Sequence, residues 1–312
     1  MAAQRLRVGR ITVDLSHPDK VLFPDDGITK GDLIDYYRDM AGRMLPLLRD
    51  RPVTMIRYPD GITAHAILQK NAPDYFPDWV TRAEVAKQGG SVRHVICDKA
   101  ATLAYLANQA CIELHVFLSR LAAIDHPDQL IFDLDPPDDE HFGQVRQAAR
   151  LLRELLEGEL GLTAFVKTTG GKGLHVHVPL DAAADFDAAR QFARQVADVL
   201  AARQPDLLTT EQRKDKRGRR IYLDVMRNAY AQTATAPYAV RGRRGAPVAT
   251  PLHWAELDDD QLSPGRFTIA TLPGRVADMT GDNDPWARLP RLRYGLARPG
   301  GRLRRLSPAA PG

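Results

Sequence analysis

The chain has 312 residues, of which 44% are apolar and 26% charged, a composition typical of a folded protein and not of a disordered one. It has no run of eighteen apolar residues, no apolar secretory leader at its start, and two cysteines only, Cys97 and Cys111. These features argue against a membrane partner, a disulfide framework and a four-cysteine zinc site, and they favour a cytoplasmic location. The formal net charge is +4, and 34 of the 43 basic residues are Arg.

Basic charge is concentrated in two segments. Residues 213–220 read RKDKRGRR, and residues 285–312 contain seven Arg and no acid. An Arg guanidinium can donate two hydrogen bonds to one phosphate, so such segments are typical of proteins that contact a polyanion. A solvated surface in an Arg-rich proteome is the alternative explanation.

Helical patterns follow one another along the chain. Thr29 and Asp32 predict a helix start, followed by apolar residues at three- and four-residue spacing from 33 to 48. Asp98 is expected to cap a second helix, and further helices are predicted over about 142–156 and 186–200. The tail, 291–312, is rich in Pro, Gly and Arg without apolar periodicity, and we expect it to be mobile at its end.

Strand-like runs alternate with these helices. They are rich in β-branched and apolar residues bounded by Gly, Pro and Asp, and they cover residues 129–135, 163–168, 174–180 and 220–226. This interleaving predicts a mixed α/β or α+β domain.

Asp133 and Asp135 lie two residues apart in the run QLIFDLD, so on a strand both carboxylates face the same side. Two neighbouring carboxylates repel each other unless a cation lies between them, and Mg²⁺ or Mn²⁺ prefers such oxygen ligands. Asp224, a lone acid in the run IYLDV, is a candidate third ligand because a buried carboxylate requires a partner. A strand edge with solvated acids is the alternative.

The segment TTGGKG at 168–173 separates two predicted strands. Its glycines permit a tight turn that brings N–H groups close to an anion, and Lys172 adds a positive charge. The segment is therefore a candidate phosphate loop, although it lacks the Walker pattern and a plain Gly-rich hairpin is equally consistent with it. His175 and His177 share a face of the following strand, where we expect His177 to be structural.

Several motifs in order resemble one known family. They are ELH at 113–115, FDLDP at 132–136, KTTGGKGLHVHV at 167–178, YLDVMRN at 222–228, APYAVRGR at 236–243, HPDKVLFP at 17–24 and TKGDLIDYY at 29–37. Together they resemble the polymerase domain of bacterial ligase D, in the archaeo-eukaryotic primase superfamily. The resemblance covers about residues 11–290.

The resemblance implies an α+β fold with a primase-like catalytic core of mixed or antiparallel sheets flanked by helices. It implies one primase-polymerase domain over 1–290, with a DNA-end-binding part at about 11–97 and a catalytic core at about 98–290. Residues 291–312 are then a basic tail.

The implied activity is template-dependent nucleotide addition to a primer 3′-OH at DNA gaps or broken ends, with ribonucleotides preferred, in end joining or gap filling. Some relatives also prime. The implied cofactors are two Mg²⁺ or Mn²⁺ ions. The implied partners are gapped, nicked or broken duplex DNA with a 5′-phosphate, NTP or dNTP, Ku and a separately encoded ligase, in the cytoplasm near the nucleoid.

The family's functional positions transfer onto matching residues of this chain. Asp133, Asp135 and Asp224 would be catalytic metal ligands. The residues that would meet the incoming nucleotide are His115, Thr169, Gly171, Lys172, Gly173, Arg217, Arg227 and Arg241. His17, Lys20 and Lys30 would bind the 5′-phosphate of the downstream strand, and Ile67 and Leu68 would contact the template.

The chain departs from the family pattern at four places. No KxDG ligase motif or preceding phosphoesterase segment is found, so we expect a stand-alone, ligase-independent relative. Ile67 and Leu68 stand where aromatic residues usually stack on template bases, and aliphatic side chains offer no π-face. His17 replaces the usual Asn, and Thr169 replaces the usual Ser.

Two alternative functions remain open at this point. A haloacid-dehalogenase-like phosphatase also uses an apolar strand ending in DxD, but it leaves the 222–228 and 236–243 segments unexplained. A non-catalytic DNA-end binder of the same fold is the other alternative. Three acids facing phosphate disfavour it, because they weaken the binding of a polyanion.

Overall fold

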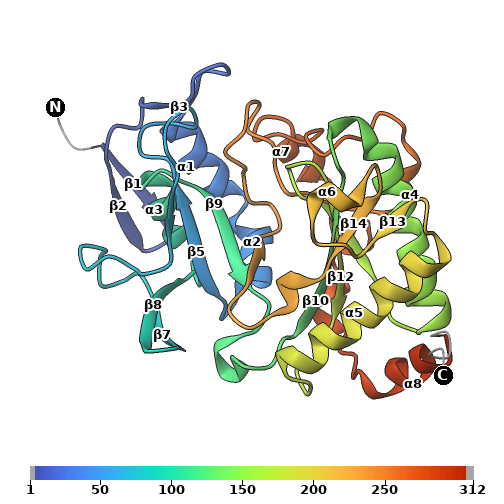
Figure 1. Ribbon diagram of the computed structural model, residues 1–312. Helices are drawn as coiled ribbons and strands as arrows, with labels where there is room; N and C mark the ends of the chain where they lie inside the picture. The colour runs from blue at the N-terminus through green and yellow to red at the C-terminus, as the bar shows by residue number, and fades with distance from the viewer. Residues whose placement is uncertain (1–3, 307–312) are drawn as a thin grey trace. The chain divides into compact units, whose positions relative to one another are not determined.

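The computed structural model describes residues 4–306 (Figure 1). The chain forms two compact units, each assembled from segments that are distant in sequence. Unit 1 comprises Met1–Ala122, Thr233–Thr250 and Gly265–Thr280. Unit 2 comprises Ala123–Gln232, Pro251–Pro264 and Gly281–Gly312. Neither unit is therefore a continuous stretch of the chain.

Unit 1 is built on an antiparallel sheet with strand order β15-β9-β5-β8-β7, and β6 pairs with β5. The strands are β5 (Pro52–Arg57), β6 (Ile67–Gln69), β7 (Arg82–Lys87), β8 (Gly90–Ile96), β9 (Cys111–Phe117) and β15 (Thr233–Thr235). The central strands β5 and β9 are buried along most of their length, and the register partners Met55 and Leu114 lie fully in the core.

Two hairpins and several helices complete the part of unit 1 that the structure describes. The hairpins are formed by β1 (Gln4–Val8) with β2 (Ile11–Leu15) and by β3 (Val21–Phe23) with β4 (Ile28–Thr29). The helices are α1 (Lys30–Asp39), α2 (Ala41–Leu48), α3 (Ala100–Asn108) and α7 (Leu272–Ala277). Helix α1 packs against α3, whose side chains are almost all buried.

Unit 2 contains the second sheet, with strand order β13-β14-β10-β12-β11-β16. Its strands are β10 (Gln129–Asp135), β11 (Phe165–Thr168), β12 (Leu174–Pro179), β13 (Leu208–Thr209), β14 (Ile221–Asp224) and β16 (Pro251–Leu252). The β13–β14 pair is parallel and the other pairs are antiparallel. The mixed α+β architecture expected from the sequence is therefore confirmed.

The helices of unit 2 are α4 (Phe142–Arg153), α5 (Phe186–Arg203), α6 (Lys214–Arg217) and α8 (Ala297–Leu306). Both α4 and α5 pack on β10, the strand that carries the paired acids (Figure 1). Helix α4 continues into a π-helical segment, Glu154–Glu159. No helix within residues 4–306 is both long and apolar enough to cross a membrane.

The predicted first helix is divided into α1 and α2. Thr29 caps α1 in a capping box with Asp32, as its sequence indicates. The chain then turns at Met40 before α2 begins. Apolar periodicity continues through this turn because it reports which side chains face the core and not whether the backbone hydrogen bonds are unbroken.

The expected cap of α3 is wrong. The residue at the cap position is Lys99, and its side chain makes no capping bond. Asp98 instead accepts a hydrogen bond from the Thr81 hydroxyl at 2.6 Å. This contact joins residues that are 17 positions apart, so local sequence does not reveal it.

Residues 297–306 of the tail form helix α8, where the sequence showed no helical pattern. Pro299 lies in the first turn, where its missing N–H costs no helical bond. Pro299 and Leu303 are buried on one face of the helix, and the arginines face outward. Residues 307–312, which include the expected mobile end, lie outside the described part of the chain.

Candidate active site

Three carboxylates meet at one end of the unit 2 sheet. Asp133 and Asp135 lie on the same face of β10. Leu134, between them, and Phe132, just before Asp133, are buried in the core. Asp224, the last residue of β14, is the direct register partner of Asp133. The sheet therefore brings together three acids that lie up to 91 residues apart in the chain.

The surroundings of these carboxylates shift their pKa values in different directions. Burial would raise the pKa of Asp133, but the contact with His175 and the charges of Arg227 and Lys167 lower it below its ordinary value. Burial, and next the negative charge of Asp133, raise the pKa of Asp135. Burial, together with the charge of Asp133, also raises the pKa of Asp224.

His175 lies behind the acids on β12, with its Nε2 3.5 Å from an oxygen of Asp133. Burial, followed by the charge of Lys167, lowers the pKa of His175 to about 4. The imidazole is therefore neutral at pH 7, and its contact with Asp133 is not an ion pair. His177 contacts Gln129 through Nδ1 at 3.1 Å, which agrees with the structural role expected for it.

Cationic side chains approach the acids from neighbouring segments. Arg217 places Nη1 3.4 Å from Asp135 and lies over the Tyr222 ring, with its guanidinium carbon 3.8 Å from the ring centre. Arg227 Nε is 3.7 Å from Asp133. These contacts bring five predicted site residues into one cluster within unit 2.

The side chains as they stand do not form a closed metal site. Within residues 4–306, no group of three His, Cys, Asp or Glu side chains is arranged to hold a metal ion. Asp135 turns toward Arg217, and Asp224 accepts a hydrogen bond from the backbone N–H of Met226 at 2.7 Å. The donor set nevertheless fits a hard divalent cation, because three carboxylates share one end of two paired strands and two have raised pKa values that a cation would relieve.

The Gly-rich loop connects β11 with β12 beside this cluster. Thr169 lies at its base, and its hydroxyl accepts hydrogen bonds from the N–H groups of Gly171 at 3.1 Å and Gly173 at 3.3 Å. Gly173 approaches β10 so closely that a Cβ atom would lie 2.0 Å from the carbonyl oxygen of Leu134. Lys172 is half-exposed and pairs with Asp139 at 3.2 Å. Thr169 thus orders the turn that carries Lys172.

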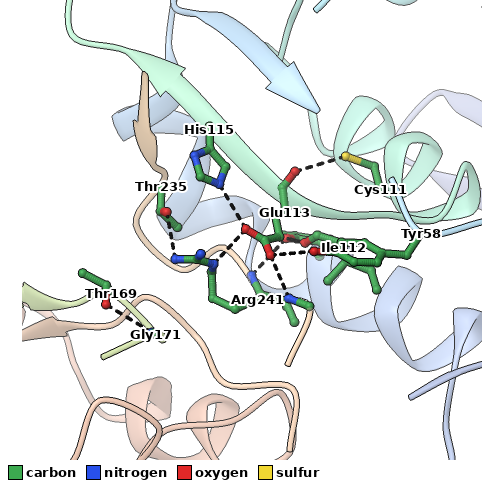
Figure 2. Close-up of polar contacts among 12 residues, drawn as sticks. Tyr58, Cys111, Ile112, Glu113, His115, Thr169, Gly171, Thr235 and Arg241 are labelled. Carbon is green, nitrogen blue, oxygen red and sulfur yellow. Dashed lines mark hydrogen bonds and ion pairs between the residues drawn. The ribbon is translucent and has the colours of Figure 1, made fainter. Parts of the chain in front are cut away.

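A second cluster lies in unit 1 around Glu113 on β9 (Figure 2). One carboxylate oxygen accepts from Arg241 Nε at 2.8 Å and contacts His115 Nε2 at 3.1 Å. The other accepts from the Tyr58 hydroxyl and the Gly242 N–H, both at 3.0 Å. His115 and Arg241, predicted to meet the nucleotide, are therefore joined through a shared acid.

The predicted 5′-phosphate site lies in unit 1 at the β3–β4 hairpin. The Lys30 N–H donates to the carbonyl of Lys20 at 2.8 Å, and Lys20 N–H donates to that of His17 at 3.1 Å. Lys30 is only 5% exposed, and burial, followed by the charge of Lys20, lowers its pKa. Its ammonium donates to the Ser16 hydroxyl at 3.0 Å, whereas Lys20 pairs with Asp60. The hairpin thus brings two cations together.

The predicted template residues lie on β6, in the same unit. Ile67 is 44% exposed and Leu68 is 62% exposed, unusually high values for large aliphatic side chains. Tyr75 is also exposed, and its hydroxyl accepts from Arg57 at 3.1 Å. Apolar surface is therefore present at the position that the resemblance assigns to the template.

Residues 29–286 match the protein family described as LigD, primase-polymerase domain. The chain belongs to this family. The family resemblance seen in the sequence motifs is thereby confirmed, and the haloacid-dehalogenase-like alternative is set aside.

Relatives of this family member are end-joining proteins. This chain is 36% identical over 259 residues to the bifunctional non-homologous end joining protein LigD of Bacillus subtilis. The alignment covers 83% of this chain and 41% of that protein. The chain is 38% identical over 258 residues to the multifunctional LigD of Mycobacterium bovis, covering 80% of this chain and 34% of that protein. The chain therefore spans well under half the length of these relatives.

The polymerase domain of Mycobacterium tuberculosis ligase D, solved in complex with DNA, is a close structural relative. The TM-score is 0.83 at 35% sequence identity, covering 90% of this chain and 99% of that domain. The chain thus shares the primase fold of the LigD polymerase domain almost from end to end.

Two buried residues beside the predicted site residues of this LigD-family chain are not singled out by the sequence. Glu113 was noted only as part of the ELH motif, and its role depends on contacts with distant segments. Asn228 was likewise noted only as part of the YLDVMRN motif. Its buried side chain accepts a hydrogen bond from the Ile131 N–H at 2.8 Å and donates one to the Ile131 carbonyl at 2.7 Å, both on β10. Asn228 therefore fixes the turn that follows Asp224 onto the strand of the other two acids.

Proposed function

We propose that this chain is a template-dependent nucleotidyltransferase that extends a primer 3′-OH at gaps or broken ends in DNA repair. The main supporting observation is that Asp133 on β10 pairs in register with Asp224 on β14, while Asp135 lies on the same face of β10 as Asp133. A protein that only binds DNA gains nothing from three acids at one point, because they repel phosphate. Membership of the LigD primase-polymerase family supports the same class of reaction.

Two divalent ions, Mg²⁺ or Mn²⁺, are the cofactors that this donor set fits. Asp133, Asp135 and Asp224 would hold them, and bound metal would supply charge stabilisation for an in-line phosphoryl transfer. Arg217 and Arg227, which contact Asp135 and Asp133, would remain nearby to offset the charge of the triphosphate.

The remaining residues proposed to bind the nucleotide belong to the Gly-rich loop and to the Glu113 cluster. In the loop, Lys172 offers an ammonium group, and Thr169 holds the turn formed by Gly171 and Gly173. His115 and Arg241 would bind the triphosphate, a role supported by their common attachment to Glu113. Charge-assisted hydrogen bonds of this type are stronger than neutral ones.

Further details of the proposal come from the family resemblance. Ribonucleotides would be preferred, and priming would accompany extension. Ku and a separate DNA ligase would be partners in end joining. The solved relative was studied in complex with DNA, which supports a DNA substrate for this chain.

Primer extension on a one-nucleotide gap with a downstream 5′-phosphate tests the proposal. ATP and dATP are compared opposite template dT, each with Mg²⁺ and with Mn²⁺. We expect one complementary nucleotide to be added, faster from ATP. Tight binding of the gapped duplex without addition in any of the four mixtures would instead identify a non-catalytic DNA-end binder.

A further inference from the structure

Glu113 is a buried acid that the proposed reaction does not itself use. Only 4% of its surface is exposed, and it lies at the centre of the cluster in Figure 2. We propose that Glu113 is a positioning residue, which fixes the side chains of His115 and Arg241 for the incoming nucleotide. This inference rests on the proposed nucleotide-binding roles of those two residues.

The two carboxylate oxygens of Glu113 have different kinds of partner. Oε1 accepts from the Tyr58 hydroxyl and from the Gly242 backbone N–H, so it anchors the carboxylate to the scaffold. Oε2 faces Arg241 Nε and His115 Nε2, so it holds the two functional side chains. The anchored side of the carboxylate therefore determines where the functional side chains lie.

Burial would raise the pKa of Glu113, but the hydrogen bond from His115, the charge of Arg241 and the Gly242 N–H together hold it at about 2. The side chain is therefore ionised throughout the neutral range and acts only as an acceptor. A glutamine at this position would place its NH₂ group against one of two pairs of donors, either the Tyr58 hydroxyl with the Gly242 N–H or Arg241 with His115. Because all four partners present hydrogens, the amide could satisfy only one side.

The carboxylate also determines the state of its two functional neighbours. An ionised acceptor at 3.1 Å requires a hydrogen on His115 Nε2, which fixes how the ring is protonated on that side. Arg241 is held at Nε by Glu113 and at Nη1 by the Thr235 hydroxyl at 3.1 Å. Two attachment points fix the plane of the guanidinium before nucleotide binds, so less side-chain freedom is lost on binding.

Gly242 is part of the same arrangement. A Cβ atom at this position would lie 2.4 Å from the Tyr58 ring. The backbone N–H can reach Glu113 only because no side chain separates the turn from that ring. This close approach gives a physical reason for glycine between Arg241 and Arg243.

Steady-state extension of the one-nucleotide gap with ATP tests the role of Glu113. Glu113→Gln is compared with wild type, Arg241→Ala and the Glu113→Gln/Arg241→Ala double variant. Glu84→Gln is the matched control, because Glu84 is an exposed acid on β7 of the same sheet whose carboxylate accepts a hydrogen bond from the Ser91 hydroxyl. Melting temperature is measured for every variant.

We expect Glu113→Gln to raise KM for ATP by roughly tenfold to a hundredfold, the effect of losing a charged hydrogen bond. The value of kcat should stay within about threefold, because the loss lies in ground-state binding. In the Arg241→Ala background, Glu113→Gln should add little, because Glu113 acts largely through Arg241. DNA affinity and the Glu84→Gln control should match wild type.

Two results would overturn the inference. One is a folded Glu113→Gln protein with unchanged KM for ATP, and the other is full additivity with Arg241→Ala. If Glu113→Gln does not fold, Tyr58→Phe takes its place, since it removes one donor to Oε1. A rise in KM of roughly two- to tenfold then supports the inference, and no rise overturns it.

Failure of the proposed function gives a different result. In that case wild-type protein adds no nucleotide, and the same variants are compared by calorimetric titration with ATP alone. Weaker ATP binding by Glu113→Gln with intact binding by Glu84→Gln still supports the inference. Equal ATP binding, or none by wild type, overturns it.

Discussion

Asp133 and Asp135 are only two residues apart, but their carboxylates have opposite electrostatic surroundings. Asp133 is stabilised as an anion by its cationic neighbours, whereas the ionised form of Asp135 is opposed by burial and by Asp133 itself. A carboxylate with a raised pKa beside an ionised one is a common feature of sites that bind cations or do acid–base chemistry. Individual substitutions should therefore separate activity from stability.

Replacing either Asp133 or Asp135 by Ala is expected to reduce nucleotide addition by roughly 100-fold or more, because each removes a proposed metal ligand. The measurement is single-turnover extension of the gapped duplex at saturating ATP and Mn²⁺. Circular dichroism provides the folding control. Near-wild-type extension by either folded variant would contradict the catalytic assignment.

Asp224→Asn is expected to stabilise the protein when no divalent cation is present. The folded-state pKa of Asp224 is raised, so stability falls as pH rises above the ordinary Asp value through the folded-state pKa. Asn keeps the acceptor for the Met226 N–H but carries no charge. At pH 7 its melting temperature should therefore be higher than that of wild type, and each kcal/mol of stabilisation corresponds to roughly 1.5 °C in a chain of this size.

The pH dependence of this difference is its most specific feature. The difference should disappear below about pH 3, where Asp224 of the wild type is protonated in both the folded and the unfolded state. Asp133→Asn should have the opposite sign at pH 7, because the pKa of Asp133 is lowered and its charge is stabilising. Added Mg²⁺ should stabilise wild type more than Asp224→Asn. A gain independent of pH would refute the electrostatic explanation.

At the scale of secondary-structure elements, the β3–β4 hairpin brings together two lysines that are ten residues apart in the chain. Lys30 is the first residue of α1, where the positive end of the helix dipole also favours an anion. The lowered pKa of Lys30 indicates that its charge is partly uncompensated. A doubly charged terminal phosphate would supply that compensation.

Gapped duplex with a 5′-phosphate is therefore expected to bind more tightly than the same duplex with a 5′-hydroxyl. The preference should be about tenfold at low salt, shrink as salt rises and largely disappear in Lys20→Ala/Lys30→Ala. Fluorescence anisotropy with both duplexes measures it. Lys87→Ala, an exposed lysine on β7, is the control that should keep the preference. Equal affinity of wild type for both ends would contradict the site.

At the scale of the whole molecule, the net charge of +4 conceals an uneven distribution. Tyr294 pairs with Leu180 beyond the end of β12, which fixes the arginine-rich C-terminal segment at the sheet end opposite the three acids. The exposed arginines there include Arg298, Arg302, Arg304 and Arg305 on α8. Within residues 4–306, none of these four makes an ion pair with an acid.

Neutralising these four arginines to Gln is expected to weaken binding of long duplex DNA and to leave extension of a minimal gapped duplex unchanged. The slope of log affinity against log salt should become shallower by roughly 1 for each phosphate that the variant no longer neutralises. The same positions changed to Lys should retain most of the salt dependence, since the charge is kept. An unchanged slope in the Gln variant would show that α8 is only a solvated surface.

Sequence alone determined the fold class, the strand with Asp133 and Asp135, the Gly-rich loop, the capped start of α1 and the family. These features depend on residues close together in the chain, where periodicity, turn chemistry and motif order are directly readable. The same local logic gave a wrong cap at Asp98 and no helix at 297–306. In both places a distant segment is involved, because Asp98 bonds Thr81 instead of capping the helix and α8 packs against α5.

The tertiary structure alone decided which site residues meet. The register of β10 with β14 puts Asp224 opposite Asp133. Burial opposes the ionised form of both acids, but only at Asp133 do His175, Arg227 and Lys167 outweigh it and lower the pKa. Glu113 became a functional candidate only when folding brought Arg241, 128 residues away, onto its carboxylate. Hydrogen bonds and electrostatic shifts depend on distances of a few ångströms between such segments, and a linear sequence does not contain those distances.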